Sequence, residues 1–245
     1  MKRIIMLFLV LVMITAGIFF TRHKFVRQEK DKIMPVVTAE PELKTTAEPS
    51  DPIVRLSILA FKKEKKLELW GKKSDGWHHL CSYPILAASG TAGPKTCKWD
   101  MQVPEGIYKI VGINPSSRFH IAMELNYPND FDREKAKLDG RTLLGGDICI
   151  HGKAKSTGCI AVGDSSIEEI SQWVTRIGLD NTTVIIAPND LRTKEPVDEG
   201  QMRIAWVPEL YRMIKNELKT YTSAKPTQKI LTAVQPVVDR TPAPA

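Results

Sequence analysis

A histidine and a cysteine lie eight residues apart in a segment that can bring them together. The segment spans residues 145–160 and contains His151 and Cys159. Isoleucines at alternate positions before His151 predict a strand that ends at this histidine. Gly158 has no Cβ and can adopt the positive-φ or crowded geometry that a cysteine on a tight turn needs. A neighbouring imidazole lowers the pKa of a thiol or accepts its proton, so the pair predicts a nucleophile, Cys159, and its base, His151.

Cys149 gives the same segment a second interpretation. It shares a strand face with His151, so Cys149, His151 and Cys159 could together ligate zinc. Asp147 or His120 would then supply a fourth ligand. The spacing matches no common zinc motif. We therefore expect a site without a metal or a cofactor.

The segment resembles the signature of the YkuD-type L,D-transpeptidase catalytic domain, a His-Gly pair followed by Ser-x-Gly-Cys and an apolar residue. The matching residues are His151-Gly152 and Ser156-Thr157-Gly158-Cys159-Ile160. The resemblance implies that Cys159 is the nucleophile, that His151 is its base, and that the carbonyl of Gly152 orients the imidazole. Backbone N–H groups around Gly158 would stabilise an oxyanion. Ser156 is expected to support the loop.

The resemblance extends from about residue 54 to residue 188 and favours one subgroup. The short gap between histidine and cysteine is similar to that of enzymes acting on the linkage of lipoprotein to peptidoglycan. Residues 103–110 look like the Pro-x-Gly-x-aromatic strand of the family, and residues 117–120 and 126–129 look like the pocket side of the subgroup. Within them Arg118 and His120 are expected to bind substrate, Arg118 through a carboxylate.

The resemblance implies an acyltransferase that acts on peptidoglycan stem peptides and forms a thioester on Cys159. An amine of another stem peptide as acceptor would crosslink the wall, and a lipoprotein lysine would attach the lipoprotein. Water as acceptor would make the protein a hydrolase that trims stem peptides or releases lipoprotein. A non-catalytic wall-binding module is the alternative of another class, because Thr157 and Ala161 stand where many members have histidine and arginine.

Composition fits a globular protein outside the nucleic-acid-binding class. The chain has 245 residues, 42% of them hydrophobic, and a net charge of +7. Residues 1–30 account for most of this excess, whereas the remainder is close to neutral. The basic residues therefore flank an apolar segment and do not form a patch for nucleic acid.

Residues 1–24 are predicted to be a membrane anchor or a signal segment. The apolar run 4–20 follows Lys2-Arg3 and lacks a clear cleavage pattern, so an uncleaved anchor in the inner membrane is favoured. The proline-punctuated residues 25–52 predict a tether, residues 53–220 the catalytic domain, and residues 221–245 a disordered tail. The implied substrate then places the domain in the periplasm or another extracytoplasmic part of a bacterial envelope.

The apolar patterns predict a mainly β fold with a few helices (α+β), and the resemblance implies a β-sandwich-like L,D-transpeptidase domain. Strands are expected over residues 53–59, 67–70, 80–86, 106–113, 119–125 and 182–187. Helices are expected over residues 165–177, capped by Ser165 and Glu168, and from Pro208 to about residue 218. The segment 126–146 is expected to be a loop with a short helix beside the site.

Two further features of the sequence, a pair of cysteines and a run of charged residues, each allow two interpretations. Cys81 and Cys97 could form a disulfide in an exported protein, or both could be ordinary buried thiols. The run Lys62-Lys63-Glu64-Lys65-Lys66 is interpreted as a solvated turn, not as a functional basic patch.

Overall fold

The computed structural model describes residues 51–197 and 200–222. In this part of the chain the structure is mainly strand with a few helices, which confirms the predicted fold class. The predicted membrane segment, nearly all of the tether and nearly all of the tail lie outside the described residues, and the domain limits stay a prediction. Among the residues that the structure describes, no helix combines the length and the apolar character needed to cross a bilayer.

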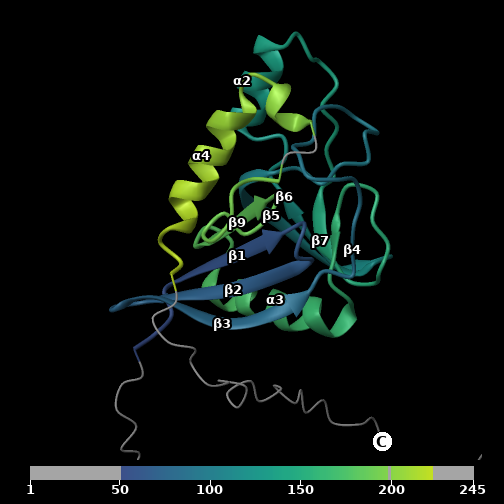
Figure 1. Cartoon of the computed structure of the whole chain (residues 1–245). Coiled ribbons are helices and arrows are strands. Elements are labelled where there is room, and N and C mark those ends of the chain that lie inside the picture. Colours follow the sequence, from purple (N-terminus) through teal and green to yellow (C-terminus); the bar gives the residue numbers. More distant parts are fainter. Residues whose placement is uncertain (1–50, 198–199, 223–245) are drawn as a thin grey trace, which may run out of the picture. The chain divides into compact units, whose positions relative to one another are not determined.

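The described strands form one mixed sheet of nine strands (Figure 1). Their order is β3-β2-β1-β9-β5-β6-β7-β8-β4. The strands are β1 (Arg55–Phe61), β2 (Lys66–Lys73), β3 (Gly76–Pro84), β4 (Ala87–Ala88), β5 (Gly106–Ser117), β6 (His120–Leu125), β7 (Cys149–His151), β8 (Ile160–Ala161) and β9 (Thr182–Ala187). The pairs β1–β9 and β7–β8 are parallel, and the other pairs are antiparallel.

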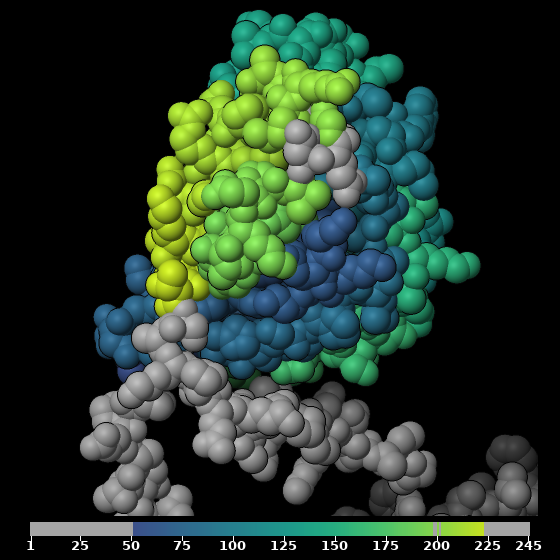
Figure 2. Space-filling view, viewed as in Figure 1, coloured from purple at the N-terminus to yellow at the C-terminus, as the bar shows by residue number. Residues whose placement is uncertain are grey.

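Helices cover the centre of the sheet on both faces. Helix α3 (Asp164–Ile177) packs with Leu56 and Ile58 of β1, whereas α4 (Val207–Leu218) packs with Leu59 and Phe61. Successive strand residues point to opposite faces, so one strand supplies both cores. Such two-sided burial explains why β1 is almost continuously apolar. In Figures 1 and 2 the yellow-green α4 lies against the blue first strands, far from it in sequence.

The predicted helix before Gly178 is confirmed, but its predicted capping box is wrong. Helix α3 begins at Asp164, with Gly163 at the N-cap and no side-chain cap. The carboxylate of Asp164 instead accepts the backbone N–H of Lys153. A capping box is present at the start of α2 (Asp130–Leu138), the short helix expected in the loop after β6. The remaining 3₁₀ helix, η1 (Gln201–Arg203), precedes α4.

The turn between β1 and β2 is not uniformly solvated. Lys62 is buried, and its Nζ donates to the carbonyl oxygens of Gly93 and Val103 at 2.8 and 3.0 Å. The same ammonium lies 3.1 Å from the buried carboxylate of Glu105, which also accepts the N–H of Gly93. The interpretation of a solvated run is therefore wrong for Lys62, because tertiary acceptors replace water. This contact fixes both ends of the segment between Gly93 and Val103.

Replacement of Lys62 by methionine is expected to lower the free energy of unfolding by about 3–5 kcal/mol. The variant leaves the Glu105 carboxylate buried without its cation, which costs more than the ion pair itself contributes. Denaturant unfolding measures the effect. The double variant Lys62→Met/Glu105→Gln should recover part of the loss, and Lys65→Met, at an exposed position of the same turn, should change stability by less than about 0.5 kcal/mol. Equal losses in Lys62→Met and Lys65→Met would contradict the argument.

The four cysteines, Cys81, Cys97, Cys149 and Cys159, are all free. Cys97 is exposed, and Cys81 is half-buried with its thiol 3.0 Å from the hydroxyl of Tyr83. The structure therefore contains free thiols and not the Cys81–Cys97 disulfide. The expectation of two buried thiols is wrong for Cys97.

Candidate active site

The structure brings together the two residues whose spacing first suggested chemistry. His151 ends β7, and Cys159 immediately precedes β8. These strands are parallel neighbours, with Ile150 opposite Ile160. The His151 imidazole lies close enough to Cys159 to lower the pKa of its thiol. The predicted strand and turn, together with β8, therefore place an imidazole beside a thiol.

Gly152 and Phe119 fix the orientation of the His151 ring. The Nδ1 of His151 lies 2.5 Å from the carbonyl oxygen of Gly152. A carbonyl only accepts, so Nδ1 carries a hydrogen and Nε2 is left for Cys159. Phe119 stacks on the ring, with centroids 4.6 Å apart and planes at 30°. The contact expected for Gly152 is present. Phe119 belongs to the segment 117–120 that was expected on the pocket side, but its stacking on the imidazole was not predicted.

The environment of Cys159 favours a thiolate. A hydrogen bond from Cys149 is the largest cause, burial opposes it, and His151 and the backbone N–H of Cys149 add to it, so the pKa of Cys159 is lowered to about 5. Burial lowers the pKa of His151, but its bonds with Cys159 and the Gly152 carbonyl more than offset this, and the net pKa is raised. The two shifts favour a thiolate on Cys159 beside a protonated His151.

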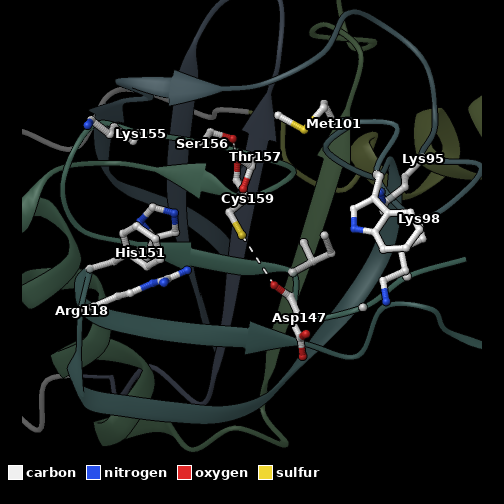
Figure 3. A pocket seen from close by; sticks show the side chains of 15 residues that line it. Lys95, Lys98, Met101, Arg118, Asp147, His151, Lys155, Ser156, Thr157 and Cys159 are labelled. Carbon is white, nitrogen blue, oxygen red and sulfur yellow. Dashed lines mark hydrogen bonds between the residues drawn. The ribbon is translucent and has the colours of Figure 1, made fainter.

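Cys149 is the proton-bearing partner of Cys159. Its backbone N–H lies 3.3 Å from the Sγ of Cys159. Interaction with the Cys159 sulfur, together with burial, raises the pKa of the Cys149 thiol. Both sulfurs lie near the carbonyl oxygen of Asp147, that of Cys159 at 3.6 Å (Figure 3). One negative charge in a shared site explains the opposite directions of the two shifts.

A pair of serines holds the turn that carries Cys159. The Oγ of Ser156 donates to the carbonyl of Cys159 at 2.6 Å and also contacts the Oγ of Ser89. The N–H of Gly158 donates to the Oγ of Ser89 at 2.6 Å, and Gly158 has a φ of 116°, as expected for a residue without Cβ. The contacts of Ser156 and Gly158 support the loop. Because the N–H of Gly158 is used by Ser89, it does not point to an oxyanion.

Two cavities meet at Cys159. The first, here called the lysine cavity, has a volume of about 510 Å³ and is lined by Lys98, Lys155 and Arg118, among others. The second, the Glu124 cavity, has a volume of about 580 Å³ and is lined on one side by Glu124. Both cavities share Arg118, Phe119, Asp147, His151 and Cys159. In Figure 3, Arg118 and His151 lie on one side of Cys159, and Lys95 and Lys98 on the other.

An exposed indole stands at the rim of the lysine cavity. Trp99 is 78% exposed and has a φ of 66°, and Met101 of the same segment has a φ of 58°. Asp100 holds this strained segment, because its carboxylate accepts the N–H groups of neighbouring residues and the ammonium of Lys95. Left-handed backbone in residues other than glycine is costly and needs such support. Sequence reasoning found no signal here.

Of the two predicted substrate-binding residues, only Arg118 lines the cavities. Its guanidinium lies 4.8 Å from the centroid of Phe119, continuing the stack on His151. His120 is not among the residues that line either cavity. Its Nε2 lies 2.5 Å from a carboxylate oxygen of Glu168 on α3, so it ties the sheet to that helix.

The residues considered for zinc do not form a ligand set. Over residues 51–197 and 200–222, no group of three or more His, Cys, Asp and Glu side chains has the geometry to hold a metal ion. His120 is engaged with Glu168, and Asp147 presents its backbone carbonyl to the sulfurs. The zinc alternative therefore receives no support from the geometry.

Replacement of Gly152 by alanine is expected to lower activity about 10²-fold. The added Cβ would lie 2.6 Å from the carboxylate of Asp164 and 2.7 Å from the carbonyl of Phe119. Phe119 packs on His151, so the clash displaces the imidazole, and small misplacements of catalytic groups cost about this much. Steady-state kinetics measures the loss. Val111→Ala, at an exposed position that lines neither cavity, is the control, and an equal effect in both variants would contradict the prediction.

Replacement of Cys149 by alanine is expected to raise the pH midpoint for alkylation of Cys159 by about 1–2 pH units. A hydrogen bond to a charged group contributes about 1.5–3 kcal/mol, and one pKa unit corresponds to about 1.4 kcal/mol. The thiolate fraction grows as pH rises through the pKa, so wild-type alkylation should increase around pH 5 and then level off. Iodoacetamide labelling followed by mass spectrometry measures the midpoint. Cys149→Ser, which keeps a donor, should shift it less; unchanged midpoints would oppose the assignment.

A family model confirms the class that the fold and site define. The L,D-transpeptidase catalytic domain (YkuD) matches residues 56–186, which is more than half of the chain. The chain belongs to this family, and the family predicted from its His-Gly and Ser-x-Gly-Cys residues is confirmed. The mainly β architecture with helices on both faces is the fold of its catalytic domain.

Individual relatives extend the comparison. The chain is 37% identical over 120 residues to the Escherichia coli K12 protein named "Putative L,D-transpeptidase YafK", covering 48% of this chain and 46% of the relative. Among solved structures it is similar to the helical cell shape determining protein Pgp2 from Campylobacter jejuni, with 22% identity, a TM-score of 0.47, and coverage of 64% of this chain and 54% of the other. It is also similar to Bd1075 of Bdellovibrio bacteriovorus, with 23% identity, a TM-score of 0.42, and coverage of 68% of this chain and 55% of the other. The chain spans about half the length of these relatives.

Proposed function

We propose that this protein is a cysteine-dependent L,D-transpeptidase that acts on peptidoglycan stem peptides in the bacterial envelope. The observation that carries the proposal is the position of Cys159 beside an oriented His151 at the meeting point of two cavities, in surroundings that lower the pKa of its thiol. A thiolate in this setting is a nucleophile for acyl transfer. The predicted N-terminal anchor and tether would hold the domain outside the inner membrane, within reach of the wall.

The charges of the two cavities suit a donor and an acceptor. Lys98, Lys155 and Arg118 line the lysine cavity, and free carboxylates of a stem peptide would be attracted to them. Glu124 lines only the Glu124 cavity and would attract the protonated amine of an acceptor. Arg118 lines both and is placed to hold a carboxylate of either peptide. A site open on two sides favours transfer between two peptides over simple hydrolysis.

The reaction follows from the resting protonation states. The Cys159 thiolate attacks the carbonyl carbon of the residue before a terminal D-alanine. The imidazolium of His151 then protonates the departing amine, the C–N bond breaks, and a thioester remains. The amine of the acceptor attacks the thioester carbonyl carbon and His151 takes its proton. A new C–N bond forms and the C–S bond breaks. This step regenerates the Cys159 thiolate and the protonated His151. The proton is exchanged at Nε2 of His151, while the Gly152 carbonyl accepts the hydrogen on Nδ1.

The identity of the acceptor decides the net reaction. An amine of a second stem peptide gives a 3→3 crosslink, a lipoprotein lysine gives attachment, and water gives hydrolysis from the same thioester. A wall-linked lipoprotein is therefore a further candidate partner. A wall-binding module without catalysis needs neither a lowered thiol pKa nor an oriented imidazole, so these features favour an enzyme.

Mass spectrometry of defined muropeptides incubated with the full-length protein tests the proposal. Loss of D-alanine with a new 3→3 dimer is the expected result. Shortened stem peptides or released lipoprotein peptides would instead assign hydrolysis through the same Cys159. If the folded protein forms no 3→3 dimer, no shortened stem peptide and no released lipoprotein peptide, the enzymatic proposal is excluded and the wall-binding module is favoured.

A further inference from the structure

Cys149 and Cys159 lie opposite each other on the parallel strands that carry the site. Ile150 of β7 pairs with Ile160 of β8, so the same register, one residue earlier, places Cys149 opposite Cys159. Neighbouring strands lie about 4.8 Å apart. That separation falls in the range of roughly 4.4–6.8 Å between the Cα atoms of disulfides. A disulfide can therefore form here with little movement of the backbone.

The two sulfurs also share one environment. Both sulfurs lie within 4 Å of the carbonyl oxygen of Asp147, at 3.9 and 3.6 Å, and the backbone N–H of Cys149 lies 3.3 Å from the Sγ of Cys159. Both cysteines are half-buried and line the Glu124 cavity, which has room for a small oxidant. None of the other cysteines lines that cavity. The geometry therefore singles out one pair among the four thiols.

The two thiols are suited to different steps of one oxidation. Cys159 holds the charge and is the sulfur that an electrophilic oxidant meets first. Cys149 keeps its proton and lies against the sulfur that would be oxidised. A reactive thiolate with a second cysteine in contact is the arrangement found in redox-sensitive sites. The mechanism of acyl transfer makes no use of the Cys149 sulfur as a reactant.

We propose that Cys149 is the resolving cysteine of Cys159, and that the two form a reversible disulfide after a hydroperoxide oxidises Cys159. The thiolate attacks one peroxide oxygen, the O–O bond breaks, and the released alkoxide or hydroxide takes a proton from water. Cys159 is thereby oxidised by two electrons to a sulfenic acid. The Cys149 sulfur then attacks it, the S–O bond breaks, an S–S bond forms, and the hydroxyl leaves with the Cys149 proton as water.

The disulfide switches the site off and protects it. It removes the nucleophile from the acyl transfer, a consequence that rests on the proposed function. It also stops the sulfenic acid from reaching the sulfinic and sulfonic acids, which are not reversed by thiols. A dithiol restores both cysteines by thiol–disulfide exchange.

Peptide mapping tests the inference without a substrate. The full-length protein is treated with hydrogen peroxide, remaining thiols are blocked, and trypsin cleaves after Lys153 and Lys155, between the two cysteines. The expected product is a pair of peptides joined through Cys149 and Cys159, lost on treatment with dithiothreitol. Cys149→Ser should instead accumulate irreversibly oxidised Cys159. Cys97→Ser, which changes an exposed thiol outside the cavity, should still form the joined peptides.

Two outcomes would overturn the inference. One is equal accumulation of irreversibly oxidised Cys159 in the wild type and in Cys149→Ser. The other is the absence of any Cys149–Cys159 peptide after peroxide treatment that oxidises other thiols. Where muropeptide activity is present, wild-type protein should regain most of it after dithiothreitol, whereas Cys149→Ser should regain less than about a tenth. If the Cys149–Cys159 peptide forms but the protein has no muropeptide activity, the proposed function is contradicted and the redox inference is supported.

Discussion

Cys159→Ala is expected to lower the release of D-alanine from tetrapeptide substrates by at least about 10⁴-fold. The variant removes the atom that forms the thioester, and loss of a covalent nucleophile generally costs an enzyme this much or more. The fold should be retained, because Cys159 is only half-buried and its turn is held by Ser89 and Ser156. Liquid chromatography with mass spectrometry of the products measures the rate.

A serine at the same position is the matched control. Cys159→Ser keeps the size and a hydrogen-bonding group, but its hydroxyl is a weak nucleophile without strong activation. It should therefore be nearly as inactive as alanine and should bind stem peptides with unchanged affinity. Substantial turnover by Cys159→Ala would exclude the thioester mechanism outright.

His151→Ala is expected to reduce turnover by about 10²–10⁴-fold, the range typical of a general acid–base residue. Two effects combine, because the leaving amine loses its proton donor and Cys159 loses a contact that lowers its pKa. The alkylation midpoint of Cys159 should accordingly move above pH 5, so fewer thiolates are present at neutral pH. Rates of D-alanine release and of iodoacetamide labelling, each as a function of pH, measure the two effects separately.

Phe119 provides a comparison for this prediction. It stacks on His151 without carrying a proton, so Phe119→Leu should lower turnover less than His151→Ala and leave the alkylation midpoint nearly unchanged. A shift of the midpoint in Phe119→Leu as large as in His151→Ala would mean that packing, and not the imidazole charge, controls the thiol.

Local patterns were enough to predict most of the fold. The alternation of apolar residues located β5 and β6, nearly continuous apolar runs located β1 and β9, and the 3.6-residue period located α3 and α4. Helices are buried along one stripe and strands on one or both faces, so short stretches of sequence are enough to predict which of their residues are buried. The capping box failed because Ser165 follows Asp164 into the helix, while the Asp164 carboxylate is used by Lys153, a partner that no local pattern identifies.

The sequence by itself determined the family and the pairing of His151 with Cys159, because one strand, one turn and one glycine hold both residues within a short segment. Only the tertiary structure decided the surroundings of that pair. Phe119 and Ser89 reach it from distant segments. Arg118 stays in the site, whereas His120, two residues along, is held by α3. Cys149 acquires its place opposite Cys159 from strand pairing. Contacts between distant segments depend on which strands pair and how the elements pack, and the spacing of residues along the chain does not predict them.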